Sequence, residues 1–310
     1  MRRISATKRT LVSLFVAAVV VFLVLPFALK DRTKHRLLGP RLSELTHTEV
    51  TFRNGNLSLA GMLFLPDTTL PCAAVVFIHG SGASKRDNVW YLTVAKYLQE
   101  NGVAVLVPDK RGSERSRGDW TTATFEDLAG DTDAAVDFLE HQAIFRCSKV
   151  GVVGFSQGGW IAPVAATRDP NIAFVVSMSG AGVTTDEQLL HEVANEITRF
   201  GTYHFVGRLL APLGAGFVRR SAYWKVIGGF DPIPYWRKVT VPTFMAFGEG
   251  DQNVPVRQSI ARMQALHNPN IVVRVYPKGG HAILDRVTYR VQQSYLRDLA
   301  AFVNTATIPR

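Results

Sequence analysis

The chain has 310 residues, of which 47% are hydrophobic and 19% are charged. This composition excludes wholesale disorder and is sufficient for a large core, so the length fits either two domains or one large α/β domain. The two cysteines, Cys72 and Cys147, are too few for a disulfide scaffold or for a zinc site built from four thiolates.

The net charge of +10 is concentrated near the N-terminus. Eight of the 35 lysines and arginines, but only one of the 25 acids, lie within residues 1–36. The remainder of the chain is therefore close to neutral. Because the basic excess flanks an apolar run, it is typical of a membrane-flanking segment rather than of a nucleic-acid-binding face. We expect no nucleic-acid partner.

The apolar run extends from Leu11 to Leu29 and contains no charged residue. A helix of this length spans roughly 28 Å, which is close to the thickness of the hydrocarbon core of a bilayer. We therefore predict a basic tail at 1–10, a single-pass transmembrane anchor (an uncleaved signal-anchor) at 11–29 and a linker at 30–47. A short basic tail resists crossing a membrane, which favours a domain outside the cytoplasm.

Two alternatives to an anchor remain for this segment. A cleaved signal peptide would require small residues at its cleavage site, and Leu25-Pro26-Phe27-Ala28 offers only one. The second alternative is a helix buried in the core.

The chain from residue 48 onward has the pattern of an α/β protein. Two alternating segments around Asn54-Gly55 predict a β-hairpin over 48–53 and 57–65. Short apolar runs then alternate with helical patterns, which predicts a mostly parallel sheet with helices on both faces over residues 48–304. The expected strands are 73–78, 103–107, 149–155, 173–177, 241–247 and 271–276, and the expected helices are 87–100, 125–141, 256–267 and 286–303.

Residues 182–238 interrupt this alternation because they contain no convincing strand. The segment is too long for a plain loop and is rich in aromatic and aliphatic residues, so we predict a helical lid inserted above the sheet. A crossover helix with some decoration is the alternative. The apolar side chains of a lid would suit an acyl chain or another hydrophobic group, although such residues more commonly pack a helix onto its body.

A candidate nucleophile lies in Gly154-Phe155-Ser156-Gln157-Gly158, which matches G-x-S-x-G between an expected strand and an expected helix. Such a turn is sharp and strained, so glycine is needed on both sides of the serine. The hydroxyl of Ser156 would then lie above the sheet edge at the positive end of the following helix. An ordinary glycine-rich turn is the alternative interpretation.

A serine hydroxyl needs a base, and the base needs a carboxylate that orients it. His281, in Gly279-Gly280-His281, follows the last expected strand and is the candidate base. Asp251 follows the preceding strand and is the candidate acid, with Glu249 as its nearby competitor. The chain order Ser156, Asp251, His281 is the order expected for such a fold.

The negatively charged oxygen of a tetrahedral intermediate requires backbone N–H donors. The small residues of His79-Gly80-Ser81-Gly82 follow the strand that should neighbour the nucleophile strand. We therefore predict an oxyanion hole formed by the N–H group of Ser81, or of its neighbour Gly82, together with that of Gln157.

Taken together, these motifs resemble the α/β-hydrolase superfamily. The segments 79–82, Asp109-Lys110-Arg111-Gly112 and 124–128 are similar to bacterial esterases and serine-aminopeptidase-like hydrolases related to dienelactone hydrolase. This resemblance implies no cofactor, and it implies that Asp109 and Arg111 brace their loop. The position at which this branch usually has a further glycine is Glu114 here. The sequence has neither an H-E-x-x-H motif nor paired cysteines, so no metal is expected.

The function predicted from the sequence is hydrolysis of carboxylic esters, with a small-molecule ester as substrate. Glu187, Glu192 and Glu196 in the lid could bind the amino terminus of a peptide, so an aminopeptidase is an alternative. Acyl-thioester hydrolysis is another. A membrane-tethered binding module on an inactive hydrolase scaffold would be a different class of protein, which the complete Ser-Asp-His set argues against.

The two cysteines also yield a structural prediction. Cys72 lies seven residues before His79, and Cys147 lies nine residues before Ser156. If the strands that precede His79 and Ser156 are parallel neighbours, both thiols lie at the same sheet edge, within the range of a disulfide. Such a bond would persist only in an oxidising compartment. Two unpaired, half-buried thiols are the alternative.

Overall fold

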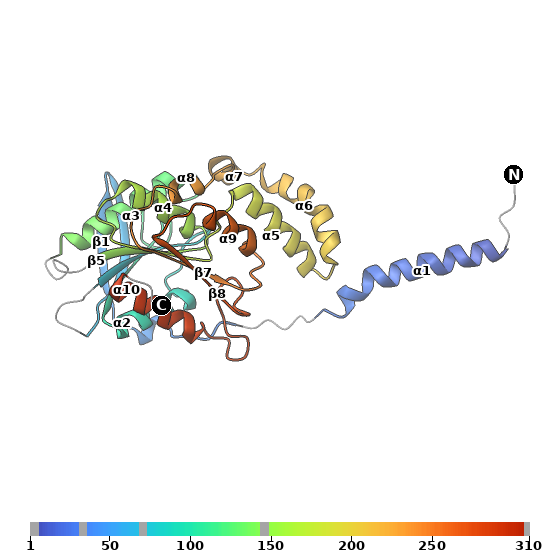
Figure 1. Ribbon diagram of the computed structural model, residues 1–310, viewed down its shortest axis with the longest axis horizontal. Helices are drawn as coiled ribbons and strands as arrows, with labels where there is room; N and C mark the ends of the chain where they lie inside the picture. Colours follow the sequence, from blue (N-terminus) through green and yellow to red (C-terminus); the bar gives the residue numbers. More distant parts are fainter. Residues whose placement is uncertain (1–5, 31–35, 68–72, 143–148, 307–310) are drawn as a thin grey trace.

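The computed structural model describes residues 6–30, 36–67, 73–142 and 149–306 (Figure 1). Within these residues an eight-stranded sheet has the order β1-β2-β4-β3-β5-β6-β7-β8. The hairpin strands β1 and β2 are antiparallel, and β2 pairs antiparallel with β4, after which the pairings are parallel. The strands are β1 (Thr48–Asn54), β2 (Leu57–Phe64), β3 (Ala73–Ile78), β4 (Val103–Pro108), β5 (Lys149–Phe155), β6 (Val175–Met178), β7 (Thr243–Gly248) and β8 (Ile271–Tyr276).

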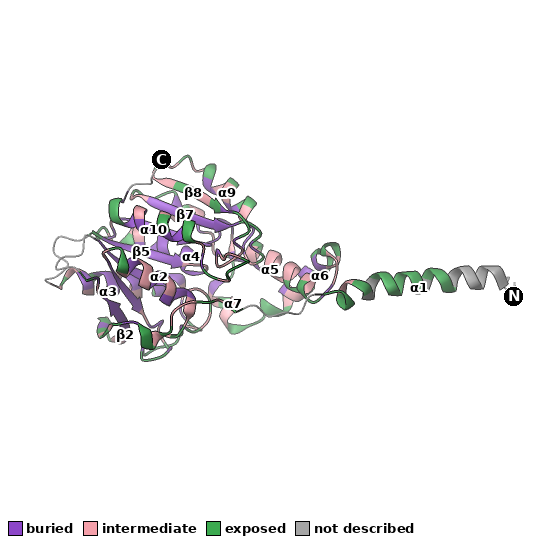
Figure 2. Ribbon diagram, turned by 90° about the horizontal axis from the view of Figure 1, so that it is seen from below, coloured by how far each residue is buried: buried purple, intermediate pink, exposed green. Residues whose placement is uncertain are grey.

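The central strands β3 and β5 place two of the motifs singled out in the sequence, 79–82 and 154–158, side by side. Every residue of β3 is buried, as expected for a parallel strand covered on both faces. The neighbouring strand β5 is likewise mostly buried (Figure 2). Ile78 at the end of β3 is paired with Gly154 near the end of β5. The prediction that these strands are adjacent and parallel is thus confirmed. Cys72 and Cys147 lie outside the described residues, so their pairing stays a prediction.

Helices cover both faces of the sheet (Figure 1). One face packs against α2 (Val89–Glu100) and α10 (Gln293–Thr305), and the other against α3 (Phe125–Glu140), α4 (Gly158–Arg168) and α9 (Val256–Gln264). Local capping fixes where two of these helices begin. The side chain of Asn88 accepts the N–H of Trp90 before α2, and Thr124 forms a capping box with Asp127 at α3.

The last helix begins later than the sequence pattern predicted, at Gln293 rather than at residue 286. The carboxylate of Asp285 accepts the N–H groups of Val287 and Thr288, both at 2.8 Å, and thereby closes a turn. Tyr289 is in the left-handed region with φ of 53°. A side chain that accepts nearby backbone N–H groups in this way competes with helix formation. The apolar pattern of the sequence does not reveal this competition.

The predicted lid segment folds into several helices between β6 and β7 rather than into one crossover helix. They are α5 (Thr185–Arg199), α6 (His204–Val218), α7 (Ala222–Ile227) and α8 (Ile233–Trp236). α5 and α6 form a helical hairpin beyond the end of the sheet, and α8 packs against α4 and α9 on the body (Figure 1).

The N-terminal segment contains α1 (Ala6–Ala28), which extends away from the domain (Figure 1), and a short 3₁₀ helix, η1 (Leu42–Glu44). Among the described residues, no helix is long and apolar enough to cross a membrane. The predicted transmembrane anchor at 11–29 is therefore not supported. The alternative of a buried core helix is wrong, because side chains such as Leu14 and Phe15 are exposed.

Candidate active site

Ser156 lies on a sharp turn between β5 and α4. Its φ of 54° is left-handed, and its N–H donates a 2.9 Å hydrogen bond to the carbonyl oxygen of Met178. A Cβ atom on Gly154 would lie 2.2 Å from the carbonyl oxygen of Gly158, and one on Gly158 would lie 2.2 Å from that of Ile78. Both positions therefore require glycine. The turn holds the serine at the N-terminal end of α4, at the carboxyl edge of the sheet.

His281 and Asp251 form a hydrogen-bonded pair. The Nδ1–H of His281 donates to Oδ2 of Asp251 at 2.8 Å, and the Asp251 side chain is fully buried. The other carboxylate oxygen accepts the N–H groups of Asn253 at 2.8 Å and Val254 at 3.0 Å. With Nδ1 bound in this way, a neutral imidazole keeps Nε2 as its proton acceptor.

Glu249, the competing acid from the sequence, is directed elsewhere. It is exposed, and its carboxylate accepts the backbone N–H of Lys278 at 3.1 Å. The structure thus brings Asp251, and not Glu249, to the imidazole of His281.

Ser156 and His281 line the same pocket of about 240 Å³. In the described structure no hydrogen bond joins these two side chains; in sites without bound substrate such hydrogen bonds are often long or poorly aligned. The rest of the wall comes from the loop after β3, from the beginning of α2 and from the lid helix α5. The pocket therefore opens between the sheet edge and the lid, and it can hold a reacting carbonyl group within reach of the serine.

Two backbone donors are available for an oxyanion. Ser81 lines the pocket, and Gln157 directly follows the serine. Neither the N–H of Ser81 nor that of Gln157 donates a hydrogen bond to another described residue. Gly82, the alternative donor, is not among the described residues that line the pocket; it turns the loop with φ of 82°.

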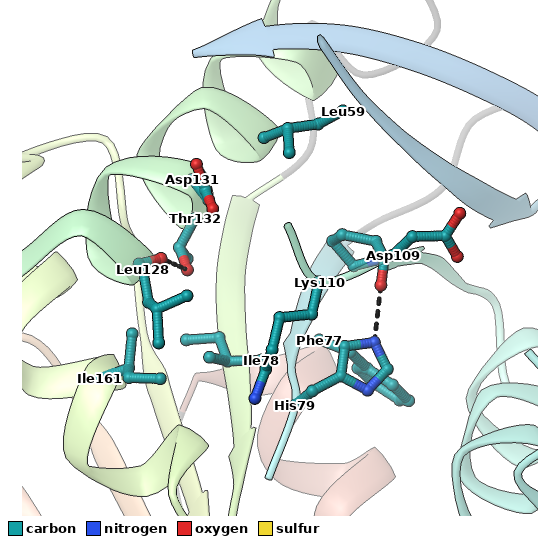
Figure 3. Close-up of a pocket in the computed structure, with 11 residues that line it drawn as sticks. Leu59, Phe77, Ile78, His79, Asp109, Lys110, Leu128, Asp131, Thr132 and Ile161 are labelled. Atoms are coloured by element: carbon teal, nitrogen blue, oxygen red, sulfur yellow. Dashed lines mark hydrogen bonds between the residues drawn. The ribbon is translucent and has the colours of Figure 1, made fainter. Parts of the chain in front are cut away.

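Lys110, to which the sequence alone gave no role, connects the segments that carry the N–H groups of Ser81 and Gln157. It is buried behind the loop after β3, beside Ile78 and His79 in the small pocket of Figure 3. Its Nζ donates to the carbonyl oxygen of Gly80 and, at 3.1 Å, to Oε1 of Gln157. The carbonyl of Gly80 belongs to the peptide group that carries the N–H of Ser81. Lys110 therefore restrains that peptide group from behind.

Burial lowers the pKa of Lys110 to about 7. The partners of the Lys110 side chain are neutral, and its one titratable neighbour is His79. Burial, with the nearby Lys110 charge, lowers the pKa of His79 to about 4, so His79 is neutral at pH 7. The remaining contact of the ammonium group is the face of the Trp120 ring, 5.8 Å from Nζ to the ring centroid.

We expect Lys110→Met to reduce kcat by about 10- to 100-fold with little change in KM, because Lys110 positions the N–H group of Ser81, and a donor to an oxyanion acts in the transition state. The wild-type rate should also decline as the pH rises through about 7, where Lys110 loses its charge, and the variant should lack this decline. Steady-state kinetics across pH test both effects, with the exposed Lys96→Met as control. A parallel loss in Lys96→Met, or an unchanged kcat in Lys110→Met, would contradict this role.

The neighbours of Lys110 brace the same loop, as the family resemblance implied. Asp109 accepts a forked pair of hydrogen bonds from the guanidinium group of Arg86, the shortest at 2.7 Å. Arg111 binds Asp131 at 2.6 and 2.8 Å. Glu114, which replaces the expected glycine, has a left-handed φ of 50°. The backbone of Glu114 thus has a conformation that glycine adopts readily.

The three lid glutamates have different environments. Glu192 lines the pocket of Ser156 and His281, and burial raises its pKa. Glu187 caps α5 through Thr184 and forms an ion pair with Arg262, and Glu196 forms an ion pair with Arg199. Within the described part of the chain, no cluster of histidine, cysteine and acidic residues is placed to hold a metal ion.

Residues 75–288 match the model of the Alpha/beta hydrolase family, and the chain belongs to this family. It is 26% identical over 79% of its length to dipeptidyl aminopeptidase BIII of Pseudoxanthomonas mexicana, of which the match covers 36%. The chain thus spans about a third of the length of the curated peptidases it matches.

Solved structures with the same fold include esterases and a dienelactone hydrolase. The Pyrococcus furiosus esterase Pf2001 superposes with a TM-score of 0.62 at 20% identity, covering 88% of this chain and 97% of that one. The dienelactone hydrolase of Anabaena variabilis superposes with a TM-score of 0.58 at 21% identity, covering 85% and 99%. The resemblance inferred from the sequence motifs is confirmed.

Proposed function

We propose that this protein is a serine hydrolase that cleaves carboxylic esters through an acyl-enzyme intermediate. The observation that carries the proposal is the pocket that holds Ser156 and His281 together, with the imidazole oriented by the buried Asp251. The esterases among its structural relatives support an ester as substrate.

In the proposed reaction, Oγ of Ser156 attacks the ester carbonyl carbon while Nε2 of His281 takes the hydroxyl proton. The N–H groups of Ser81 and Gln157 stabilise the oxyanion of the tetrahedral intermediate. Its collapse breaks the bond to the alcohol, which leaves with the proton from His281. A water molecule then attacks the acyl-serine, again losing its proton to His281, and releases the acid and free Ser156.

Hydrolysis rates of the full-length protein on matched substrates test the reaction class. The panel contains aryl esters, acyl thioesters and aminoacyl amides with the same acyl group. We expect the highest kcat/KM for the esters. Faster cleavage of the thioesters or the amides would show that the protein is a thioesterase or an aminopeptidase instead. If no substrate of the panel is cleaved, a binding module on an inactive hydrolase fold explains the protein better.

Glu192 favours a second candidate function, the hydrolysis of substrates with a free amino group. It is the one lid glutamate that lines the catalytic pocket, and none of the described cations forms an ion pair with it. An ammonium group next to the scissile bond would supply the missing positive charge. The similarity to a dipeptidyl aminopeptidase is consistent with such a substrate.

We expect Glu192→Gln to lower kcat/KM for an aminoacyl ester by about 10-fold or more, while the des-amino ester changes by less than about threefold. The preference for the aminoacyl ester over the des-amino ester should grow as the pH rises, because the raised pKa of Glu192 shifts ionisation of its carboxyl group to higher pH. Glu196→Gln is the matched control on the same helix. Equal effects of Glu192→Gln on both esters would remove the amine-binding role and leave the esterase proposal intact.

A further inference from the structure

The outer face of α6 has a continuous stripe of exposed apolar side chains. Phe205, Leu209, Leu213 and Phe217 recur every four residues and are 58%, 73%, 67% and 72% exposed, with Leu210 and Val218 beside them. Side chains at this spacing share one face of a helix. We define these six residues as the α6 stripe. An exposed apolar patch of this kind marks an interaction surface.

The opposite face of α6 explains why the stripe points outward. Gly207, Ala211 and Ala215 are buried, and a Cβ atom on Gly207 would lie 2.3 Å from the carbonyl oxygen of Ala194 in α5. The small residues allow the two helices to approach closely. The buried face of α6 is therefore made of small residues, whereas the large apolar side chains of the α6 stripe are exposed.

The α6 stripe continues into the C-terminal part of α1. The ring of Tyr203 stacks on Phe22 of α1 at 4.3 Å between centroids and on Phe205 of the stripe at 5.8 Å. A Cβ atom on Gly201 would lie 2.7 Å from Cα of Phe27, so the turn before α6 touches the end of α1. In Figure 2 the end of α1 lies beside α6, away from the sheet. The two helices thus present neighbouring apolar surfaces.

The charges around the α6 stripe are positive. Residues 200–230 contain no aspartate or glutamate. Arg208, Arg219 and Arg220 are exposed on α6 or at its end. Arg219 forms an ion pair with Asp186 at 2.7 Å, and Arg220 lies over the ring of Phe217 at 5.7 Å. An apolar helix face bordered by arginines is the pattern of a helix that lies in the interface of an anionic membrane.

We propose that the α6 stripe, together with the adjoining end of α1, docks on the surface of an anionic lipid bilayer. A second copy of the chain fits this face less well, because it would bring the same arginines against one another. Docking requires no helix to cross the bilayer. α6 packs on α5, whose Glu192 lines the catalytic pocket, so the membrane would lie one helix away from the site. Docking of the α6 stripe does not depend on which substrate is cleaved.

Binding of the full-length protein to vesicles tests this surface. The variant Leu209→Ser/Leu213→Ser/Phe217→Ser removes three exposed side chains, and Val272→Ser/Val275→Ser/Val287→Ser is the matched control at exposed positions on the body. On vesicles of phosphatidylcholine with phosphatidylglycerol, we expect the α6 variant to bind at least about tenfold more weakly and the control to bind as wild type. Unchanged secondary structure by circular dichroism would show that the variant is folded.

An environment-sensitive fluorophore on a cysteine at position 213 separates the α6 stripe from α1. In a Cys72→Ser/Cys147→Ser background, the label at Leu213→Cys should shift to shorter wavelength on anionic vesicles and be quenched by nitroxide lipids, whereas a label at Val287→Cys should not. Pure phosphatidylcholine should give at least about a tenfold weaker response. The proposal is wrong if the protein binds vesicles without a response at 213, if the α6 variant binds as wild type, or if the 213 label is buried by self-association without lipid.

Discussion

Replacing Ser156 with alanine should reduce ester hydrolysis by on the order of 10⁴-fold or more and leave the protein folded. The turn at Ser156 is fixed by Gly154 and Gly158 and by the hydrogen bond from the Ser156 N–H to Met178, none of which needs the hydroxyl group. Alanine therefore loses the nucleophile without disturbing the turn. Serine and alanine both have a Cβ atom, so the left-handed φ of 54° at position 156 causes no additional steric contact in the variant.

The experiment compares kcat/KM on an aryl ester with the melting temperature of wild type and variant. A residual rate above a tenth of wild type would assign the nucleophile elsewhere. Loss of activity together with a large fall in melting temperature would also contradict the expectation, because Ser156 lines the open pocket and no hydrogen bond among the described residues involves its hydroxyl group.

The second large effect concerns Asp251. We expect Asp251→Asn to lower kcat by at least roughly 100-fold, because the imidazole loses the charge that holds its tautomer and stabilises its protonated form. The remaining Oδ1 of asparagine could still accept the N–H groups of Asn253 and Val254, which keeps the turn in place. The amide nitrogen would then face Nδ1 of His281, and this arrangement favours a proton on Nε2, the atom that must accept one.

Glu249→Gln is the matched control for this prediction. Glu249 lies two residues away on the same turn, and its contact is the backbone N–H of Lys278. We expect Glu249→Gln to retain nearly the wild-type kcat. The opposite ranking of the two variants would transfer the role of the acid from Asp251 to Glu249.

The sequence allowed the sheet and the site residues at strand ends to be predicted because both depend on local signals. Short runs of β-branched residues define buried parallel strands such as β3, and G-x-S-x-G defines the turn at Ser156. The start of the last helix could not be predicted in the same way. It depends on how the carboxylate of Asp285 binds nearby N–H groups, and the apolar pattern does not report this contact.

Contacts between segments that are distant in the chain also could not be predicted from the sequence. The spacing of Glu187, Glu192 and Glu196 does not distinguish the three side chains. In the structure Glu192 lines the pocket of Ser156 and His281, whereas Glu187 and Glu196 form ion pairs with Arg262 and Arg199. Lys110 lies in a recognisable motif, but its role depends on the carbonyl oxygen of Gly80, thirty residues away in sequence. The position of Lys110 just after the apolar run 103–108 was the sequence signal that could have indicated its burial.

The most direct test of a Ser156 nucleophile is covalent labelling of the full-length protein by a fluorophosphonate, followed by mass spectrometry of its peptides. We predict a single adduct, on Ser156, formed at a rate that falls at least roughly 100-fold in Asp251→Asn, because attack on phosphorus requires the same activated hydroxyl. An unlabelled Ser156, or an adduct on another residue that persists in Ser156→Ala, would contradict the account.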